Sequence, residues 1–262
     1  MTKYFRTIIL FWSTSLSAQL EYKLNFIVEI IAMLGTLIGS VFLLSIFFSS
    51  GRQLGEWTWE SALVVQGIYT FLDGITNSIL RPNLREIVNY VREGTLDFVL
   101  LKPIDSQFWL STRTISIAGL PEILIGLSLI TWASSQVQSQ ISFNQVISFL
   151  LLLSFSVLIL YSIWFIIAST SIWFVKTWNA TEVLRAVLAA GRFPTSAYPI
   201  LMRFLFTFIL PIAFLTTVPA EVLLGRSDFV EISLAFLFSI IFFSISRIFW
   251  KFALRFYTSA SS

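Results

Sequence analysis

The sequence predicts an all-α polytopic membrane protein with about six transmembrane helices. Its 262 residues are 56% hydrophobic and only 12% charged, far below the charged fraction of an ordinary soluble domain. Apolar windows long enough to cross a bilayer recur along almost the whole chain. Basic residues gather in alternate connections between these windows. Together the three observations indicate a single membrane domain over residues 1–262.

Six apolar windows define the predicted spans. They cover about residues 24–48, 61–80, 109–133, 145–175, 199–222 and 230–250. The second is weakened by Asp73 and Asn77, and the fifth is interrupted by Pro199, Pro211 and Pro219.

The distribution of Lys and Arg predicts the orientation. If both termini are cytoplasmic, all of the 17 basic residues except Arg52 and Arg226 fall in cytoplasmic segments. An odd number of spans would destroy this alternation. The even span count and the cytoplasmic termini therefore support each other.

Two further segments have the pattern of amphipathic helices. Residues 3–22 place apolar side chains such as Phe5, Ile9 and Trp12 on one face, which predicts a helix lying in the inner membrane interface. The segment "NATEVLRAVLAAGR", at 179–192, opposes Val183, Leu184, Val187 and Leu188 to Glu182 and Arg185, and is a second candidate of the same kind.

Composition excludes most catalytic chemistry. The chain has no Cys and no His, which removes thiol nucleophiles, His-ligated metals and Ser-His-Asp catalysis together. No Lys follows a Gly, so the phosphate-binding pattern G-x-x-x-x-G-K-[ST] is absent. We therefore expect no catalytic residues, no metal site and no ATP hydrolysis by this chain.

The stretch "RPNLREIVNYVREG", at 81–94, is strongly polar for such a chain. Asn83 and Glu86 have capping-box spacing, Pro82 resists extension of the helix backwards, and Gly94 is placed as a C-terminal cap. These signals predict a separate cytoplasmic helix over about residues 83–93. Its apolar face carries Leu84, Ile87, Val88 and Val91, and its polar face carries Arg85, Glu86, Asn89, Arg92 and Glu93.

The predicted helix has two open explanations. Amphipathicity alone is compatible with a helix resting in the lipid headgroups. Segments that bind anionic lipid usually carry mainly Lys and Arg, whereas this face also carries Glu86 and Glu93. The mixed charge favours a protein partner.

Asp73, Asn77 and Glu122 form the candidate intramembrane polar site. An acid near the middle of a span is costly and should face protein or water, so Asp73 is either a substrate-facing group or an interhelical anchor. Glu122 follows Pro121 in the third span, close to an expected kink. The sequence alone leaves these alternatives open.

The chain resembles the permease subunits of bacterial type-2 ABC transporters. The resemblance covers nearly the full length and rests on "NLREIVNYVREGTLDFVLLKPIDSQFW", "GRFPTSAYP", "LPIAF" and "VPAEVLLGR". It implies a coupling helix that docks on an ABC ATPase, and short re-entrant helices near the end of the fifth span. The coupling residues it implies are Leu84, Arg85, Glu86, Ile87, Val88, Asn89, Val91, Arg92, Glu93, Gly94, Leu96 and Asp97.

The resemblance also implies the partners and the cellular location. ATP and Mg would bind to the separate ATPase, no cofactor would bind to this chain, and a second permease subunit, a related chain rather than another copy, would complete the pathway. Membrane lipids surround such a protein in the bacterial inner membrane, and no nucleic acid takes part. The expected function is ATP-driven export. The alternatives are an intramembrane lipid-modifying enzyme and a non-transporting scaffold.

Overall fold

The computed structural model describes residues 2–19, 23–49, 56–137, 140–174, 178–226 and 229–258. Within these ranges the chain is helical and has no strand, so the prediction of an all-α fold is confirmed. Short 3-10 and π turns, labelled η, join several of the helices. The α-helices are α1 (Thr2–Gln19), α2 (Lys23–Ser49), α3 (Trp59–Ile75), α4 (Arg81–Arg92), α5 (Asp97–Leu100), α6 (Ser106–Thr112), α7 (Leu120–Val137), α8 (Phe143–Ser169), α9 (Trp178–Leu188), α10 (Ile200–Phe204), α11 (Val218–Leu223) and α12 (Phe229–Leu254).

Several helices are long and apolar enough to cross a membrane. Among the described residues they are Phe26–Ser49, Ile117–Val137, Phe143–Ile172 and Phe229–Leu254. A further pair, Ile200–Ile209 and Ala213–Leu223, meets the same criterion together but is bent by 76°. These segments confirm a polytopic membrane protein. The predicted second span corresponds to α3, which has 17 residues, and the π turn η1 (Thr76–Leu80).

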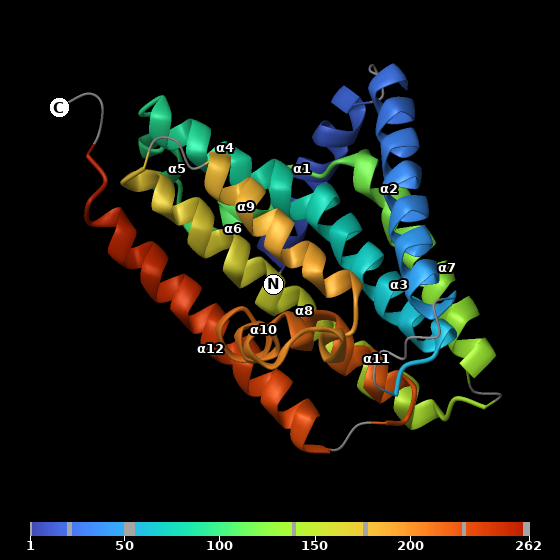
Figure 1. Cartoon of the computed structure of the whole chain (residues 1–262). Coiled ribbons are helices and arrows are strands. Elements are labelled where there is room, and N and C mark those ends of the chain that lie inside the picture. The colour runs from blue at the N-terminus through green and yellow to red at the C-terminus, as the bar shows by residue number, and fades with distance from the viewer. Residues whose placement is uncertain are drawn as a thin grey trace.

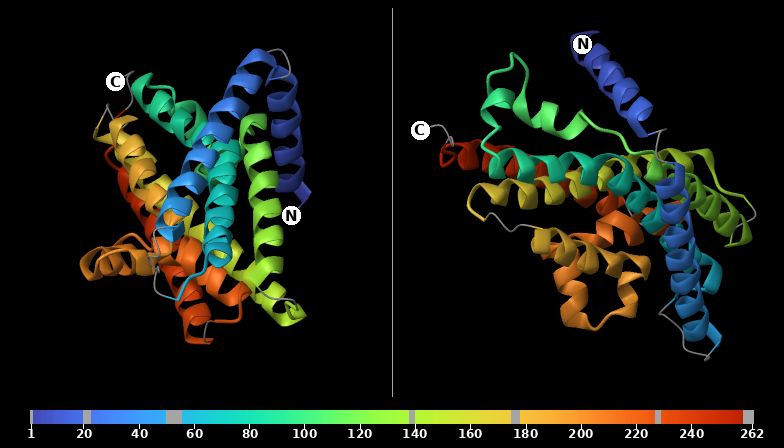
Figure 2. Two further views of the ribbon diagram at one scale, coloured as in Figure 1. Left: turned by 45° about the vertical axis from the view of Figure 1, so that its right-hand side comes forward. Right: turned by 90° about the horizontal axis from the view of Figure 1, so that it is seen from above.

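Helix α3 forms the centre of the bundle. It packs along α7, while α8 packs along α12 in a second pair; Figure 1 shows these helices side by side. Helix α2 stands to one side in contact with α3, and the view from above in Figure 2 shows α1 apart from the main bundle. Helices α4 and α5 and the C-terminal end of α12 lie at one end of the molecule (Figure 1).

Four glycines bring α3 and α7 into backbone contact. Gly67 and Gly74 lie seven residues apart on α3, and they face Gly126 of α7 and Gly119 just before it. A Cβ on Gly126 would lie 2.5 Å from the backbone nitrogen of Phe71, and a Cβ on Gly119 would lie 2.4 Å from the carbonyl oxygen of Gly74. No side chain larger than hydrogen fits at these positions. The close approach fixes the polar residues of α3 against those of α7.

Helix α4 continues α3 without a loop. Ile75 and Arg81, on either side of η1, keep right-handed helical dihedrals. The predicted capping box is therefore wrong, because Leu80 before α4 is itself helical and no side chain caps the helix. The Asn83 amide instead bonds to distant Thr114: Nδ2 donates to the Thr114 oxygen at 2.6 Å, and Oδ1 accepts from the Thr114 nitrogen at 2.8 Å. Nδ2 also donates to the oxygen of Ile79, one turn earlier, at 2.6 Å.

Pro82 does not end this helix, because the carbonyl that it leaves unpaired finds another donor. In a regular α-helix the nitrogen of residue 82 would donate to the oxygen of Ser78, which a proline cannot do. The backbone nitrogen of Ser116 donates to that oxygen at 2.7 Å. The segment before α7 thus supplies the donor that Pro82 cannot provide for the Ser78 oxygen.

Helix α4 ends at Gly94, as predicted. Gly94 has φ 67°, a left-handed conformation that glycine adopts without steric cost. The nitrogen of Thr95 donates to the oxygen of Tyr90 at 2.9 Å, and that of Gly94 donates to Val91 at 3.3 Å. This pair of bonds is a Schellman motif.

The third and fifth predicted spans differ from the structure. Residues 109–112 belong to α6, which begins after the N-cap Asp105, and the membrane helix α7 begins only at Leu120. The fifth window, 199–222, is not one straight helix, because the chain bends between η6 (Leu205–Ile209) and η7 (Ala213–Thr217) around Pro211. A bent pair of this kind is either a broken span or a re-entrant loop.

Helix α9, which covers most of the predicted second amphipathic segment, packs against α8 of the bundle. Glu182 pairs with Arg81 at 3.4 Å, while Arg192, in the turn η4 (Ala189–Arg192), lies 4.9 Å from the ring centroid of Tyr69. Helix α9 and η4 therefore run antiparallel to α3 and α4. Arg185 and Arg192, which the orientation argument placed in a cytoplasmic segment, lie beside α3.

Candidate functional site

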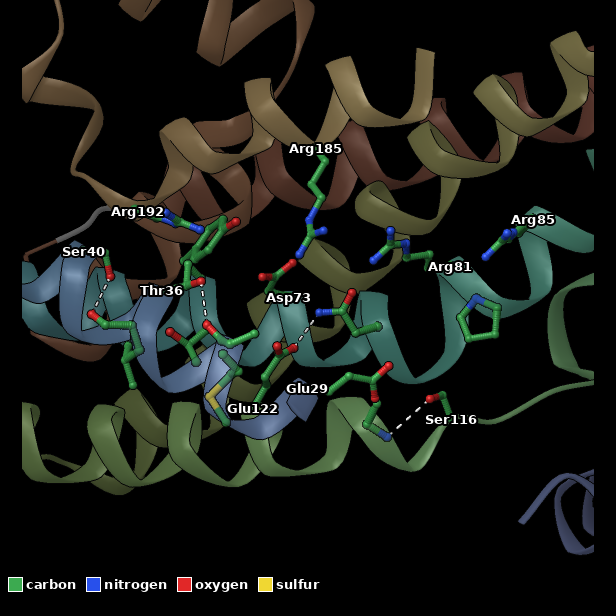
Figure 3. Close-up of a pocket in the computed structure, with 18 of the residues that line it drawn as sticks. Glu29, Thr36, Ser40, Asp73, Arg81, Arg85, Ser116, Glu122, Arg185 and Arg192 are labelled. Carbon is green, nitrogen blue, oxygen red and sulfur yellow. Dashed lines mark hydrogen bonds between the residues drawn. The ribbon is translucent and has the colours of Figure 1, made fainter. Parts of the chain in front are cut away.

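A charged cavity of about 590 Å³ lies between α2, α3, α7 and α9. Its charged residues come from six elements and are drawn in Figure 3. They are Glu29 of α2, Asp73 of α3, Arg81 and Arg85 of α4, Glu122 of α7, and Arg185 and Arg192 of α9 and η4. Charged groups at the depth of membrane helices normally face protein or water, because lipid cannot solvate them.

One wall of the cavity is a polar stripe along α3, η1 and α4. Tyr69, Asp73, Asn77, Arg81 and Arg85 follow at intervals of four residues, and all five line the cavity. Helical spacing places such residues on one face. Because α3 and α4 are continuous, the stripe runs without a break from the middle of α3 to the polar helix α4.

The structure brings together the three predicted polar residues. Asn77 donates from Nδ2 to Oε2 of Glu122 at 2.7 Å. Asp73 lines the same cavity one helical turn from Asn77. Asn77 lies within the π turn η1, and π turns inside α-helices are frequent at functional sites. Glycine contacts between α3 and α7 set this geometry.

The opposite wall carries charges that the sequence pattern did not assign to this site. Figure 3 shows Arg185 reaching toward Asp73, close enough for its charge to act on that carboxylate. The guanidinium of Arg192 lies over the ring of Tyr69. These arginines were missed because "NATEVLRAVLAAGR" has a polar face whether that face meets water or another helix. The other wall could have been predicted from the sequence, because polar residues recur every four positions from Tyr69 to Arg85.

The residues assigned to ATPase coupling fall into two groups. Leu84 and Ile87 are buried within this chain, where α4 packs on α6 and α8, and Arg85 lines the cavity. Arg92 and Glu93 are exposed at the end of α4. Leu96 is fully buried, and Asp97 begins α5. The predicted apolar docking face of α4 is therefore partly covered by the chain itself.

Exposed apolar side chains lie instead on and just after α5. Phe98 is 69% exposed and Leu101 is 81% exposed. The remaining coupling residues, Glu86, Val88, Asn89 and Val91, are partly buried. The described part of the chain contains no group of three acidic, His or Cys side chains that could hold a metal ion.

The described part of the chain is a bundle of apolar helices around a charged cavity, which is the architecture of a polytopic membrane protein. Residues 34–261 match the family described as ABC-2 family transporter protein. The chain therefore belongs to this family and is a transmembrane permease of an ABC transporter. None of the curated proteins matches the chain.

Proposed function

We propose that the chain is the membrane subunit of an ATP-driven exporter and that a separate ABC ATPase supplies the energy. The family generally works with an ABC ATPase, and the sequence has no Walker A pattern of its own. Nucleotide-driven closure of the ATPase would act on the α4–α5 end of the molecule. The long α3–η1–α4 helix would then transmit that movement to the charged cavity.

The exposed apolar pair on and after α5 is the observation that carries this proposal. Phe98 and Leu101 are largely exposed, beside the exposed charges Arg92 and Glu93. A surface with apolar anchors and a charged rim has the composition of a protein interface. The docking site proposed for the ATPase is therefore the tip of α5 with the end of α4.

The charged cavity is proposed to receive the polar part of the substrate. Its charges are both cationic and anionic, so a polar headgroup of either sign has partners there. Large apolar side chains of α2, including Ile31 and Ile38 at 64% and 66% exposure, are left uncovered nearby. A second permease subunit, a related chain according to the resemblance, and membrane lipids would cover them.

The α4–α5 end is proposed to face the cytoplasm of a bacterium, with both termini on that side. Tyr4 packs on Phe108 at 4.7 Å between ring centroids, and Trp250 donates to Ser106 at 3.0 Å, so both the first helix and the last helix reach α6. The basic residues Arg92, Lys102 and Arg255 lie exposed in the same region, and cytoplasmic segments are rich in Lys and Arg.

The docking proposal is tested by the double variant Phe98→Ser/Leu101→Ser. Tagged permease is purified from its native host in mild detergent. The ATPase recovered with it is measured as vanadate-sensitive ATP hydrolysis per permease. We expect the variant to lose most of this activity, because removing the apolar anchors of an interface weakens association strongly. The control is Ile200→Ser/Leu201→Ser on α10, where the side chains are 85% and 65% exposed.

Equal ATPase recovery from the α5 variant, the control and the wild type would contradict the docking site. Absence of any ATPase from the wild-type preparation would favour the two alternatives, a lipid-modifying enzyme or a scaffold. Arg92→Glu should lower recovery less than the double variant, because charges at the rim of an interface act mainly on specificity and association rate.

A further inference from the structure

A second concave site lies between α1 and α6 and borders the charged cavity, with which it shares Thr114. It has a volume of about 460 Å³. Its lining residues are Phe11, Thr14 and Ser15 of α1, Lys102, Trp109 of α6, and Arg113 and Thr114 from the segment before α7. This groove has no role in the proposed ATPase docking or in the substrate path.

The walls of the groove are held in place by specific contacts of α1. Trp12 donates from Nε1 to the Thr112 oxygen at 3.1 Å, and the Ser15 hydroxyl donates to the Ile115 oxygen at 2.8 Å. The ring of Phe11 meets that of Trp109 edge to face at 4.7 Å. Helix α1 is thus fixed beside α6, and the groove between them is part of the folded structure.

Two cationic side chains lie close to the indole ring of Trp109 in this groove. Lys102 Nζ lies 4.6 Å from the ring centroid of Trp109, and the guanidinium carbon of Arg113 lies 5.9 Å from it. Arg113 also donates to the hydroxyl of Tyr90. The residues that line the groove include no acid, and neither cation forms an ion pair with a described acidic residue. The groove therefore has a net positive charge.

The exposed face of α1 places the groove at the membrane surface. Phe5, Ile9 and Leu10 are 68%, 52% and 61% exposed, and α1 is an 18-residue helix outside the main bundle (Figure 2). An apolar face of this size needs an apolar medium, which an interfacial helix finds at the boundary of headgroups and acyl chains. Tryptophan and long basic side chains concentrate at the same depth.

We propose that the groove binds the headgroup of an anionic membrane phospholipid. Lys102 and Arg113 would contact the phosphate, since Arg and Lys are the main partners of phosphate oxygens. The Thr14 hydroxyl already donates to the carbonyl oxygens of Leu10 and Phe11, so toward a ligand it acts as an acceptor. That suits a headgroup with free hydroxyls, such as phosphatidylglycerol. The acyl chains would lie along the exposed apolar face of α1.

The test uses the purified protein in nanodiscs that contain phosphatidylcholine with or without phosphatidylglycerol. Lipid that stays bound after transfer to detergent is counted by native mass spectrometry. The variant Lys102→Gln/Arg113→Gln should retain about 25-fold less phosphatidylglycerol, because each basic residue near an anionic surface contributes about fivefold. The matched control is Lys251→Gln/Arg255→Gln, which removes two exposed cations at the C-terminal end of α12 and just after it. The exchange variant Lys102→Arg/Arg113→Lys should retain the lipid.

Each other outcome counts against the proposal. Equal retention by the groove variant and the wild type, or equal loss from the control, would show that the groove does not select the lipid. Release by added inorganic phosphate at constant lipid would show a site for soluble anions. If the groove variant loses ATP hydrolysis in the separate ATPase assay but keeps the lipid in nanodiscs, the two cations serve the partner protein instead. Because the lipid is counted without any ATPase present, the result is independent of the proposed function.

Discussion

Arg247 of α12 holds Asp105, the N-cap of α6, through both terminal nitrogens of its guanidinium group. Nη1 donates to Oδ1 of Asp105 at 2.7 Å and to Oε1 of Gln107 at 3.1 Å, and Nη2 donates to Oδ2. Asp105 Oδ1 also accepts from the nitrogen of Phe108 at 2.9 Å. The last helix is thus tied to the segment that follows α5. The hydrogen bonds from Arg247 are the main reason that the pKa of Asp105 lies below its ordinary value.

This ion pair predicts a loss of stability in acid. A carboxyl group whose pKa is lower in the folded state stabilises the fold above its unfolded pKa of about 3.9. The contribution is lost as pH falls through the lower, folded value. We therefore expect the melting temperature, followed by tryptophan fluorescence, to fall more steeply below about pH 4 in the wild type than in Asp105→Asn. At neutral pH the variant should melt lower.

Arg247→Lys is the matched control for this pair. It keeps the positive charge but cannot make the bidentate contact, so its melting temperature should lie between those of the wild type and Arg247→Gln. Identical acid profiles for the wild type and Asp105→Asn would contradict the assignment.

Asp73 and Arg185 should behave as a coupled pair. Asp73→Asn removes one of the acids that face Arg185, beside Glu122, and Arg185→Gln removes one of the arginines that face Asp73, beside Arg81 and Arg192. We expect each single variant to lower the melting temperature and the double variant to lower it by less than the sum, with a coupling of about 1 kcal/mol or more. Additive effects, together with lost transport and intact stability in Asp73→Asn, would instead make Asp73 a substrate-facing group.

Gly126→Ala should destabilise the protein by about 1–3 kcal/mol, because the new methyl group would overlap the backbone of Phe71. The control is Gly39→Ala on α2, where no atom lies within 4 Å of the added Cβ. That change should be neutral or slightly stabilising, since alanine favours helix more than glycine does. Equal melting temperatures for the two variants would show that α3 and α7 do not pack as closely as described.

The orientation can be tested directly because the chain has no cysteine. Glu93→Cys lies at the exposed end of α4, and Gln140→Cys lies in the exposed connection between α7 and α8. In intact cells a membrane-impermeant maleimide should label the second and reach the first only after permeabilisation. The reverse pattern would place the α4–α5 end outside.

Some features of the fold follow from local sequence and others depend on distant contacts. Gly94 was predictable because a left-handed cap depends on its own backbone. The role of Asn83 was not, since the same spacing that indicates a capping box also serves a side chain bonded to Thr114, far along the chain. Pro211 predicted a break in the fifth window, but the sequence does not state the angle of the bend.

The candidate site also combines features that the local sequence predicts with features that depend on distant contacts. Asp73, Asn77 and Glu122 were identified because polar groups are costly in apolar helices. Their convergence depends on the α3–α7 glycine contacts, which a single sequence does not reveal. The positive-inside rule counted Arg185 and Arg192 as charges of a cytoplasmic segment, and it does not reveal that α9 packs beside α3.

The uninterrupted run from Trp59 to Arg92 makes a rod about 50 Å long, while the hydrocarbon layer is about 30 Å thick. Part of the rod must therefore project beyond that layer and can act as a lever. The segment before α7 is bonded to this rod through Ser116 at Ser78, in the π turn, and through Thr114 at Asn83, in α4. The same short segment holds α1 through Ser15 and Gln19. A tilt applied at α5 would thus move α7 and α1 together. The membrane surface would then oppose or favour that movement.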